Sequence, residues 1–188
     1  NKLNVLSENM NSTVISEYKR LEKRSKNYQS EFELEKEFIK TLKEQSYEFL
    51  RINSEDDLVS NLRKKIEKLN KYQFTDNEWK YFYNDILANN NEGILEKTRK
   101  IQEDYIQTIT LEDGSKKNIY LLDKNNVHNN FVQVINQYEN TGNHLNRYDV
   151  TILINGLPMI HVELKRRGKP LREAFNQIDR YQRDSFWA

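Results

Sequence analysis

Two apolar-rich segments joined by a short turn sequence constrain the fold of this chain more than any other feature. Residues 147–154 and 159–165 are rich in β-branched and aliphatic side chains, and Asn155-Gly156-Leu157-Pro158 lies between them. Glycine supplies the positive φ that a tight turn needs, and proline is expected to stop further pairing because it has no backbone N–H. We therefore predict an antiparallel hairpin in the C-terminal third of the chain.

Hydrophobic periodicity predicts the remaining elements. Apolar residues at helical spacing predict helices over 27–50, 56–72 and 75–87, so the first hundred residues should be mainly helical. Further strands are expected over 105–111, 118–122 and 131–138, the first two joined through Asp113-Gly114, and a helix should follow Pro170. The predicted fold class is α/β in a single domain over residues 1–188, with 1–100 mainly helical and 101–188 carrying the sheet, the hairpin and the following helix.

Composition limits the kind of protein and partner. The 188 residues include no cysteine, which excludes disulfide scaffolds, thiolate nucleophiles and the commonest zinc sites. The net charge is only +1, so any nucleic-acid site must be a local patch. No apolar run approaches the roughly 18 residues that span a bilayer, and we expect a soluble, cytoplasmic protein with no membrane partner.

The predicted hairpin carries three residues suited to phosphodiester chemistry. Asp149 lies on its first strand, and Glu163 and Lys165 lie on the second, two residues apart and so on one face. Two converging carboxylates can hold Mg²⁺, which prefers oxygen ligands and polarises a phosphodiester toward attack by water. An adjacent ammonium can orient or activate that water and stabilise the negative charge that develops.

The same charges have a simpler interpretation as a solvated strand face or a cross-strand ion pair. Their sequence neighbours favour the catalytic interpretation, because apolar residues flank both Asp149 and Glu163. Burying an unpaired charge among such residues costs several kcal/mol, on the order of the penalty for transferring a polar group out of water. Something should therefore compensate these two acids.

The segments around these residues resemble a known family. They read NRYDVT (146–151), NGLP (155–158), VELK (162–165) and REAFNQIDRY (172–181). Together they are similar to the nuclease core of type I restriction endonuclease R subunits, the motor and cleavage subunits, in the PD-(D/E)xK superfamily. Segments 94–101 and 118–123 are similar as well. Tyr148 stands where the motif name has proline, a loosely held position.

The resemblance implies a fold and residue roles. The fold would be a restriction-endonuclease-like core, with a mixed central β-sheet flanked by helices and additional N-terminal helices. Asp149, Glu163 and Lys165 would be the catalytic motif, with Asp149 and Glu163 as metal ligands. Gln177 and Tyr181 would support them from the following helix, although Tyr181 also continues an apolar stripe. Relatives continue into another core strand and a helicase motor, so we expect a fragment truncated at its C-terminal end.

The resemblance also implies a function. The chain would be the nuclease domain of a type I restriction system, a Mg²⁺-dependent endonuclease that cuts double-stranded DNA without sequence specificity and away from the recognition site. ATP would enter only through the absent motor domains, and the partners would be DNA and the modification and specificity subunits. Two alternatives remain: a non-catalytic docking module, and a DNA-binding protein on a nuclease-like scaffold that does not cut.

Several further residues are candidates for the site. An acid of the first helix, Glu31 or Glu35, could join the metal ligands, although a solvated helix face is an equal alternative. A basic run that continues beyond Lys165 is a candidate for phosphate contacts; its residues are Arg166, Arg167, Lys169 and Arg172. The histidines have no metal-ligand spacing and are interpreted as structural or surface residues, although His161 could approach the site; they are His128, His144 and His161.

Overall fold

The computed structural model describes residues 3–8, 14–18, 30–140, 146–165 and 172–176. Its strands are β1 (Leu3–Glu8), β2 (Val14–Tyr18), β3 (Glu48–Phe49), β4 (Ile106–Thr110), β5 (Lys116–Tyr120), β6 (Val132–Asn140), β7 (Asn146–Ile154) and β8 (Leu157–Val162). Its helices are α1 (Glu31–Glu44), α2 (Glu55–Asn70), α3 (Asp76–Tyr81) and α4 (Ile94–Gln102), with a π-helical segment η1 (Phe82–Leu87) and a 3-10 turn η2 (Val127–Asn129). Within these described ranges, no helix is long and apolar enough to cross a membrane.

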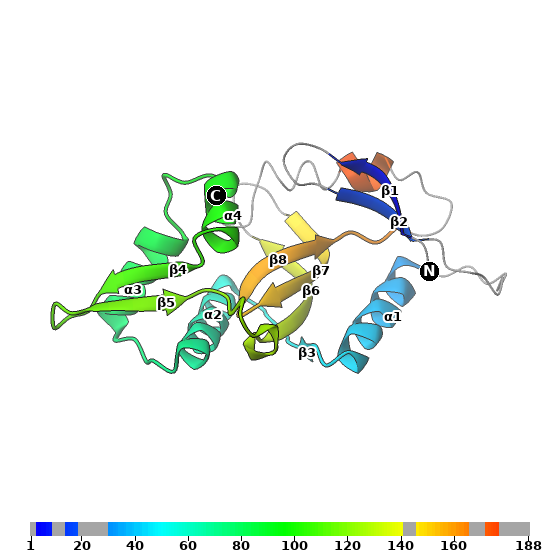
Figure 1. Ribbon diagram of the computed structural model, residues 1–188. Coiled ribbons are helices and arrows are strands. Elements are labelled where there is room, and N and C mark those ends of the chain that lie inside the picture. Colours follow the sequence, from blue (N-terminus) through cyan, green and yellow to red (C-terminus); the bar gives the residue numbers. More distant parts are fainter. Residues whose placement is uncertain (1–2, 9–13, 19–29, 141–145, 166–171, 177–188) are drawn as a thin grey trace.

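A mixed four-stranded sheet lies at the centre of the molecule (Figure 1). Its order is β3-β6-β7-β8; β3 runs parallel to β6, and the other pairs are antiparallel. Consecutive residues of β6 face opposite sides, since Val134 packs with Leu42 of α1 whereas Ile135 packs with Leu58 of α2. The sheet is therefore covered by α1 on one face and α2 on the other, which confirms the predicted α/β class and mixed sheet.

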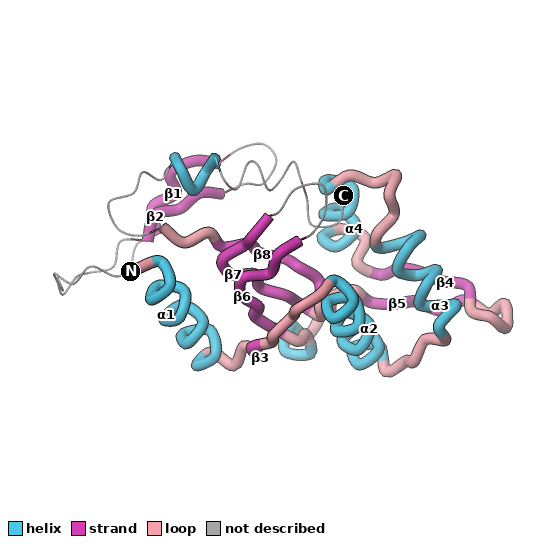
Figure 2. The backbone as a smooth tube through the Cα atoms, turned by 180° about the vertical axis from the view of Figure 1, so that it is seen from behind, coloured by secondary structure: helices cyan, strands magenta, loops and turns pink. Residues whose placement is uncertain are grey.

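The β4–β5 hairpin lies beside α2 and α3 (Figure 2), and a second core joins these elements to η1. The hairpin forms as predicted, with Gly114 in the turn at a φ of 81°. The buried side chains of this core come from all these elements and from the start of β8; they are Leu62, Ile66, Phe74, Trp79, Phe82, Leu87, Ile109, Ile119, Leu121 and Leu157. Leu157 thus anchors the central sheet to the second core.

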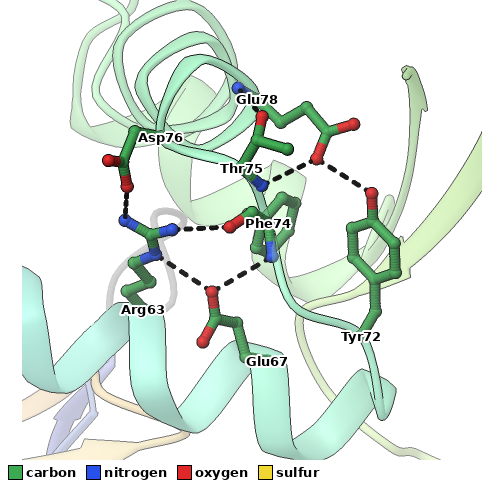
Figure 3. Close-up of polar contacts among 7 residues, drawn as sticks. All are labelled: Arg63, Glu67, Tyr72, Phe74, Thr75, Asp76 and Glu78. Atoms are coloured by element: carbon green, nitrogen blue, oxygen red, sulfur yellow. Dashed lines mark hydrogen bonds and ion pairs between the residues drawn. The ribbon is translucent and has the colours of Figure 1, made fainter. Parts of the chain in front are cut away.

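Polar contacts fasten α2 to the segment that leads into α3 (Figure 3). The guanidinium of Arg63 donates to the carbonyl of Phe74 at 2.6 Å, to Asp76 at 2.7 Å and to Glu67 at 2.9 Å. Glu67 in turn accepts the backbone N–H of Phe74 at 3.1 Å. One arginine therefore supplies several donors to a tight connection, the planar geometry for which arginine is suited.

The helical predictions need three corrections. The first helix ends at Glu44 and not at residue 50, because Ser46 takes a positive φ of 69° and Glu48–Phe49 pairs with β6 instead. The strand pair β1–β2 and the helix α4 were not predicted at all. The N-cap of α4 is Gly93, which makes no side-chain capping bond, so the usual start signal is missing. By contrast, α2 and the predicted 75–87 helix, which becomes α3 and η1, are confirmed.

The predicted hairpin forms as β7 and β8, with a tighter turn than expected. Ile154 pairs with Leu157, so Asn155-Gly156 alone makes the turn. The prediction that Pro158 stops pairing is wrong: Pro158 lies opposite Leu153 beside a register shift, an arrangement that edge strands and bulges allow. The strand β8 ends at Val162, so residues 163–165 lie beyond it.

Candidate active site

Asp149, Glu163 and Lys165 come together at one end of the β7–β8 hairpin. Asp149 lies in β7, and its Oδ2 accepts the backbone N–H of Leu164 at 2.8 Å. The ammonium of Lys165 contacts Glu163 Oε1 as a hydrogen-bonded ion pair. Contrary to the sequence prediction, Glu163 and Lys165 lie just past the end of β8 and not on a strand face. The aspartate holds the backbone between them, so the three side chains share one location.

The side chain of Glu163 is almost fully buried. Its side chain is 3% exposed and that of Lys165 is 19% exposed. The second carboxylate oxygen, Oε2, is buried and has no hydrogen-bond partner among the residues that the structure describes. Because buried polar atoms are normally hydrogen-bonded, such an oxygen indicates a strained site or an additional ligand.

The pKa values of Asp149 and Glu163 are both shifted by their surroundings. Burial raises the pKa of Asp149, although the Leu164 N–H and Lys165 partly offset this effect. Burial also raises the pKa of Glu163, where the bond to Lys165 opposes the increase and the charge of Asp149 adds to it. The acids are therefore held in surroundings that favour the neutral form unless a further positive charge is supplied.

Lys165 shows the opposite balance. Burial acts to lower its pKa, but the hydrogen bond from Lys165 to Glu163 and the negative charges of Glu163, Glu31 and Asp149 outweigh burial, and the net pKa is raised. The side chain is therefore a firmly protonated ammonium. In this state it can donate hydrogen bonds and stabilise negative charge, but it cannot accept a proton.

The donor set fits a hard divalent cation of the Mg²⁺ kind. No group of three acidic or histidine side chains within the described ranges gathers closely enough to form a complete protein cage. Mg²⁺ is commonly held by one or two carboxylates and completes its shell with water and substrate phosphate. The unpartnered Oε2 of Glu163 and the nearby carboxylate of Asp149 meet this smaller requirement.

Helix α1 brings two more acids to this region. Glu35 is only 6% exposed, and its Oε1 accepts a hydrogen bond from Asn136 Nδ2 of β6 at 2.7 Å. In addition to burial, the charges of Glu35 and Glu31 raise the pKa of Asp149, and the charge of Glu31 also acts on Glu163 and Lys165. Both predicted helix acids therefore act electrostatically on the cluster, and Asn136 of β6 holds the carboxylate of Glu35 in place.

The remaining candidates divide into placed and undescribed residues. His161 pairs with Thr151 of β7, with 2.9 Å between its Nδ1 and Thr151 Oγ1, and His128 lies exposed in η2. Arg172 is exposed at the start of a helical segment over 172–176, which agrees with the predicted start of the last helix. The others lie outside the described residues; they are His144, Arg166, Arg167, Lys169, Gln177 and Tyr181.

Sequence reasoning missed two groups that act at this location. One is the backbone N–H of Leu164, which no side-chain motif can reveal. The other is Asn136, which contacts Glu35 across 101 residues of sequence. The sequence does contain an indication of this contact. An asparagine directly after Val134 and Ile135 is unusual in a buried strand, and it indicates that the amide has a polar partner.

Comparisons with known proteins point to one family. Residues 28–187 match the family model described as type I restriction enzyme R protein N terminus. The chain is 44% identical over 182 residues to the type I restriction enzyme EcoprrI endonuclease subunit of Escherichia coli, covering 96% of this chain and 58% of that protein. It is 38% identical over 164 residues to the SsaAORF53P endonuclease subunit of Staphylococcus saprophyticus, covering 85% of this chain and 17% of that protein. In each case the chain corresponds to only part of a longer relative.

Proposed function

The chain belongs to the family of type I restriction enzyme R protein N termini, and we propose that it is the DNA-cleaving domain of such a subunit. The observation that carries the proposal is the cluster of Asp149, Glu163 and Lys165, with a buried carboxylate oxygen that has no hydrogen-bond partner in the described part of the chain. Two acids withdrawn from solvent near one ammonium are costly for stability, and a cation-assisted reaction gives this arrangement a use.

In the proposed mechanism, the side chains position the reacting groups. Asp149 and Glu163 would hold a divalent cation through their carboxylate oxygens, and the Leu164 N–H holds Asp149 in one orientation. Lys165 remains protonated, so it donates a hydrogen bond to the phosphate or to the attacking water and stabilises the negative charge that accumulates. It is not the base that removes the proton from water.

When bound, Mg²⁺ supplies Lewis-acid polarisation of the phosphodiester and makes water a better nucleophile at neutral pH. Burial raises the pKa of Asp149 and of Glu163 in the metal-free protein, and these two acids would hold a bound cation in their ionised forms. Cation binding and deprotonation of the two acids are therefore coupled, and the rate of DNA cleavage should decrease as the pH falls.

The wider activity follows from the relatives, which are named as endonuclease subunits of type I restriction enzymes. We extend the proposal accordingly: cleavage of double-stranded DNA without base specificity, driven by ATP through motor domains elsewhere in the subunit, together with modification and specificity subunits. The proposed nuclease core is of the PD-(D/E)xK type.

The test uses the full-length subunit assembled with its partners. Asp149→Asn, Glu163→Gln and Lys165→Ala should each abolish DNA cleavage and leave DNA-stimulated ATP hydrolysis near the wild-type rate, because the cut and the motor use different sites. Chelation of the divalent cation should stop cleavage, and added Mg²⁺ should restore it. The exposed acids Asp85 and Glu96 provide matched controls, since Asp85→Asn and Glu96→Gln make the same chemical changes away from the cluster.

Wild-type cleavage by the three site variants would refute the nuclease proposal and favour the docking alternative. DNA binding without any cation-dependent cleavage in the wild-type assembly would instead favour the non-cutting DNA-binding protein. The predicted supporting roles of Gln177 and Tyr181 require a separate comparison, in which Gln177→Ala and Tyr181→Phe reduce cleavage at an unchanged melting temperature.

A further inference from the structure

Asn136 follows Val132 and Val134 on one face of β6, and its side chain contacts a buried acid. Val134, two residues earlier in β6, packs in the core between the sheet and α1. Asn136 faces the same helix and donates its amide N–H to Glu35 Oε1 at 2.7 Å. Across the sheet, Asn136 pairs with Val150, the residue next to Asp149. The hydrogen bond therefore fixes an α1 carboxylate to the strand beside the catalytic aspartate.

Packing alone gives little reason for this pair. A buried carboxylate is costly unless hydrogen bonds compensate for its lost hydration, and the Asn136 amide supplies one charge-assisted bond of this kind. The charge of Glu35 also acts unfavourably on Asp149. A pair of apolar side chains at these positions would avoid both costs, as substitutions of buried polar pairs in other proteins have done.

We propose that Asn136 is a positioning residue, which holds Glu35 beside Asp149 so that the α1 carboxylate contributes to cation binding at the site. This inference rests on the proposed nuclease function. Glu35 is the more buried of the two α1 acids, its Oε1 accepts the Asn136 amide, and its charge acts on Asp149 in the neighbouring strand. Asn136 acts through Glu35 and does not touch the reacting atoms.

The experiment is a double-mutant cycle in the full-length, assembled enzyme, with Asn136→Ala, Glu35→Gln and the combination. Cleavage is followed as a function of Mg²⁺ concentration, and Mn²⁺ binding is measured by calorimetry without nucleotide. Loss of a residue that orients a metal ligand typically weakens metal affinity about 10- to 100-fold, and Asn136→Ala should shift both curves by such a factor. In the Glu35→Gln background the same substitution should add nothing, because its target is gone.

Gln133→Ala is the matched control, since Gln133 is a fully buried amide on the same strand. Its side chain contacts Asn61 and Glu48, away from Glu35. Gln133→Ala should lower the melting temperature without changing the affinity for Mn²⁺. Asn136→Ala with wild-type Mn²⁺ binding, or an additive effect in the Glu35→Gln background, would overturn the inference.

A second variant covers the case in which Asn136→Ala fails to fold. Glu35→Met combined with Asn136→Leu replaces the buried polar pair by apolar side chains, and it should fold with a wild-type or higher melting temperature. The positioning role requires this double variant to bind Mn²⁺ weakly and to cut poorly. If it binds the cation and cuts like the wild type, the pair is merely structural. Asp149→Asn distinguishes the two ways in which the inference could fail. If only the positioning role is wrong, Asp149→Asn is still inactive; if the proposed nuclease function is wrong, Asp149→Asn still cuts DNA.

Discussion

Asp149 and Glu163 are held where their charged forms are disfavoured, chiefly because both carboxylates are buried. The native chain therefore keeps protons on these acids to a higher pH than the unfolded chain does. Where the native state binds more protons, stability rises as the pH falls, so the two acids destabilise the metal-free fold most at neutral pH. Lys165 contributes in the opposite sense, because its raised pKa stabilises the fold at every pH below its ordinary titration range.

Glu163→Gln should therefore stabilise the metal-free protein at pH 7 while it abolishes cleavage. We expect a gain on the order of 1 kcal/mol, typical of substitutions that relieve a functional site. The gain should shrink as the pH falls toward the ordinary titration range of a glutamate, where the wild-type acid is protonated as well. Urea unfolding at a series of pH values from 4 to about 7.5 measures it. A less stable Glu163→Gln protein at pH 7 would mean that the Lys165 ion pair outweighs the cost of burial.

Among the elements, the β7–β8 turn does more than reverse the chain. Asn155 has a positive φ of 53°, and its buried amide donates to the carbonyl of Leu121 at 2.9 Å and to Asn130 Oδ1 at 2.8 Å. Gly156 has a φ of 83° and lies directly against the backbone of Leu62 in α2. The turn is thus packed between the sheet and the second core, which holds the β7–β8 hairpin in register.

Gly156→Ala should be strongly destabilising. A Cβ at this position would lie 2.6 Å from Leu62 Cα, which forces backbone to move in addition to the cost of a positive φ. We expect a loss on the order of 3 kcal/mol in unfolding free energy.

Gly114→Ala is the control for Gly156→Ala, because Gly114 has a similar φ of 81° with no atom within 4 Å of the added Cβ. It should cost only about 1 kcal/mol, the conformational penalty alone. Thermal or urea unfolding of the two variants compares them directly, and equal losses would show that contact with α2 contributes nothing.

For the whole molecule, the proposed function requires that attraction to DNA come from local charge, since the net charge is only +1. A groove of about 540 Å³ runs along α1 and contains three of its lysines; its lining residues are Phe32, Glu35, Lys36, Ile39, Lys40, Lys43, Glu44, Phe49 and Asn136. Lys36 lies over the ring of Phe32, and Lys40 makes only a 3.9 Å contact with exposed Glu44, an ion pair of little strength. These cations are available to phosphates beside Glu35.

Under the proposed function, a triple variant of the α1 lysines should cut DNA more weakly and with a smaller dependence on salt. This variant carries Lys36→Ala, Lys40→Ala and Lys43→Ala. Each lost phosphate contact lowers the slope of log affinity against log salt by about 0.9. The control is Lys64→Ala, Lys80→Ala and Lys116→Ala, which removes the same charge from exposed positions on α2, α3 and β5. Single-turnover cleavage at several salt concentrations distinguishes them, and identical slopes for both triple variants would exclude a DNA path along α1.

The sequence alone determined the elements whose signals are local. The β7–β8 hairpin was predictable because the apolar runs needed a turn with a positive φ, which Gly156 provides. The helix α2 was predictable because it has an apolar stripe, and Ser54 caps its N-terminus. The helix α3 was predictable because Thr75 is a capping residue. The motif residues Asp149 and Glu163 were also visible, since acids among apolar neighbours require compensation.

The tertiary structure decided the features that depend on distant segments. The strand β8 ends before Glu163, the N–H of Leu164 turns to Asp149, and Glu163 Oε2 is buried without a partner within the described part of the chain. Asn136 reaches Glu35 only because the sheet and α1 pack together. Burial and hydrogen-bond partners are set by packing between segments far apart in sequence, so no local pattern of residue types could have specified them.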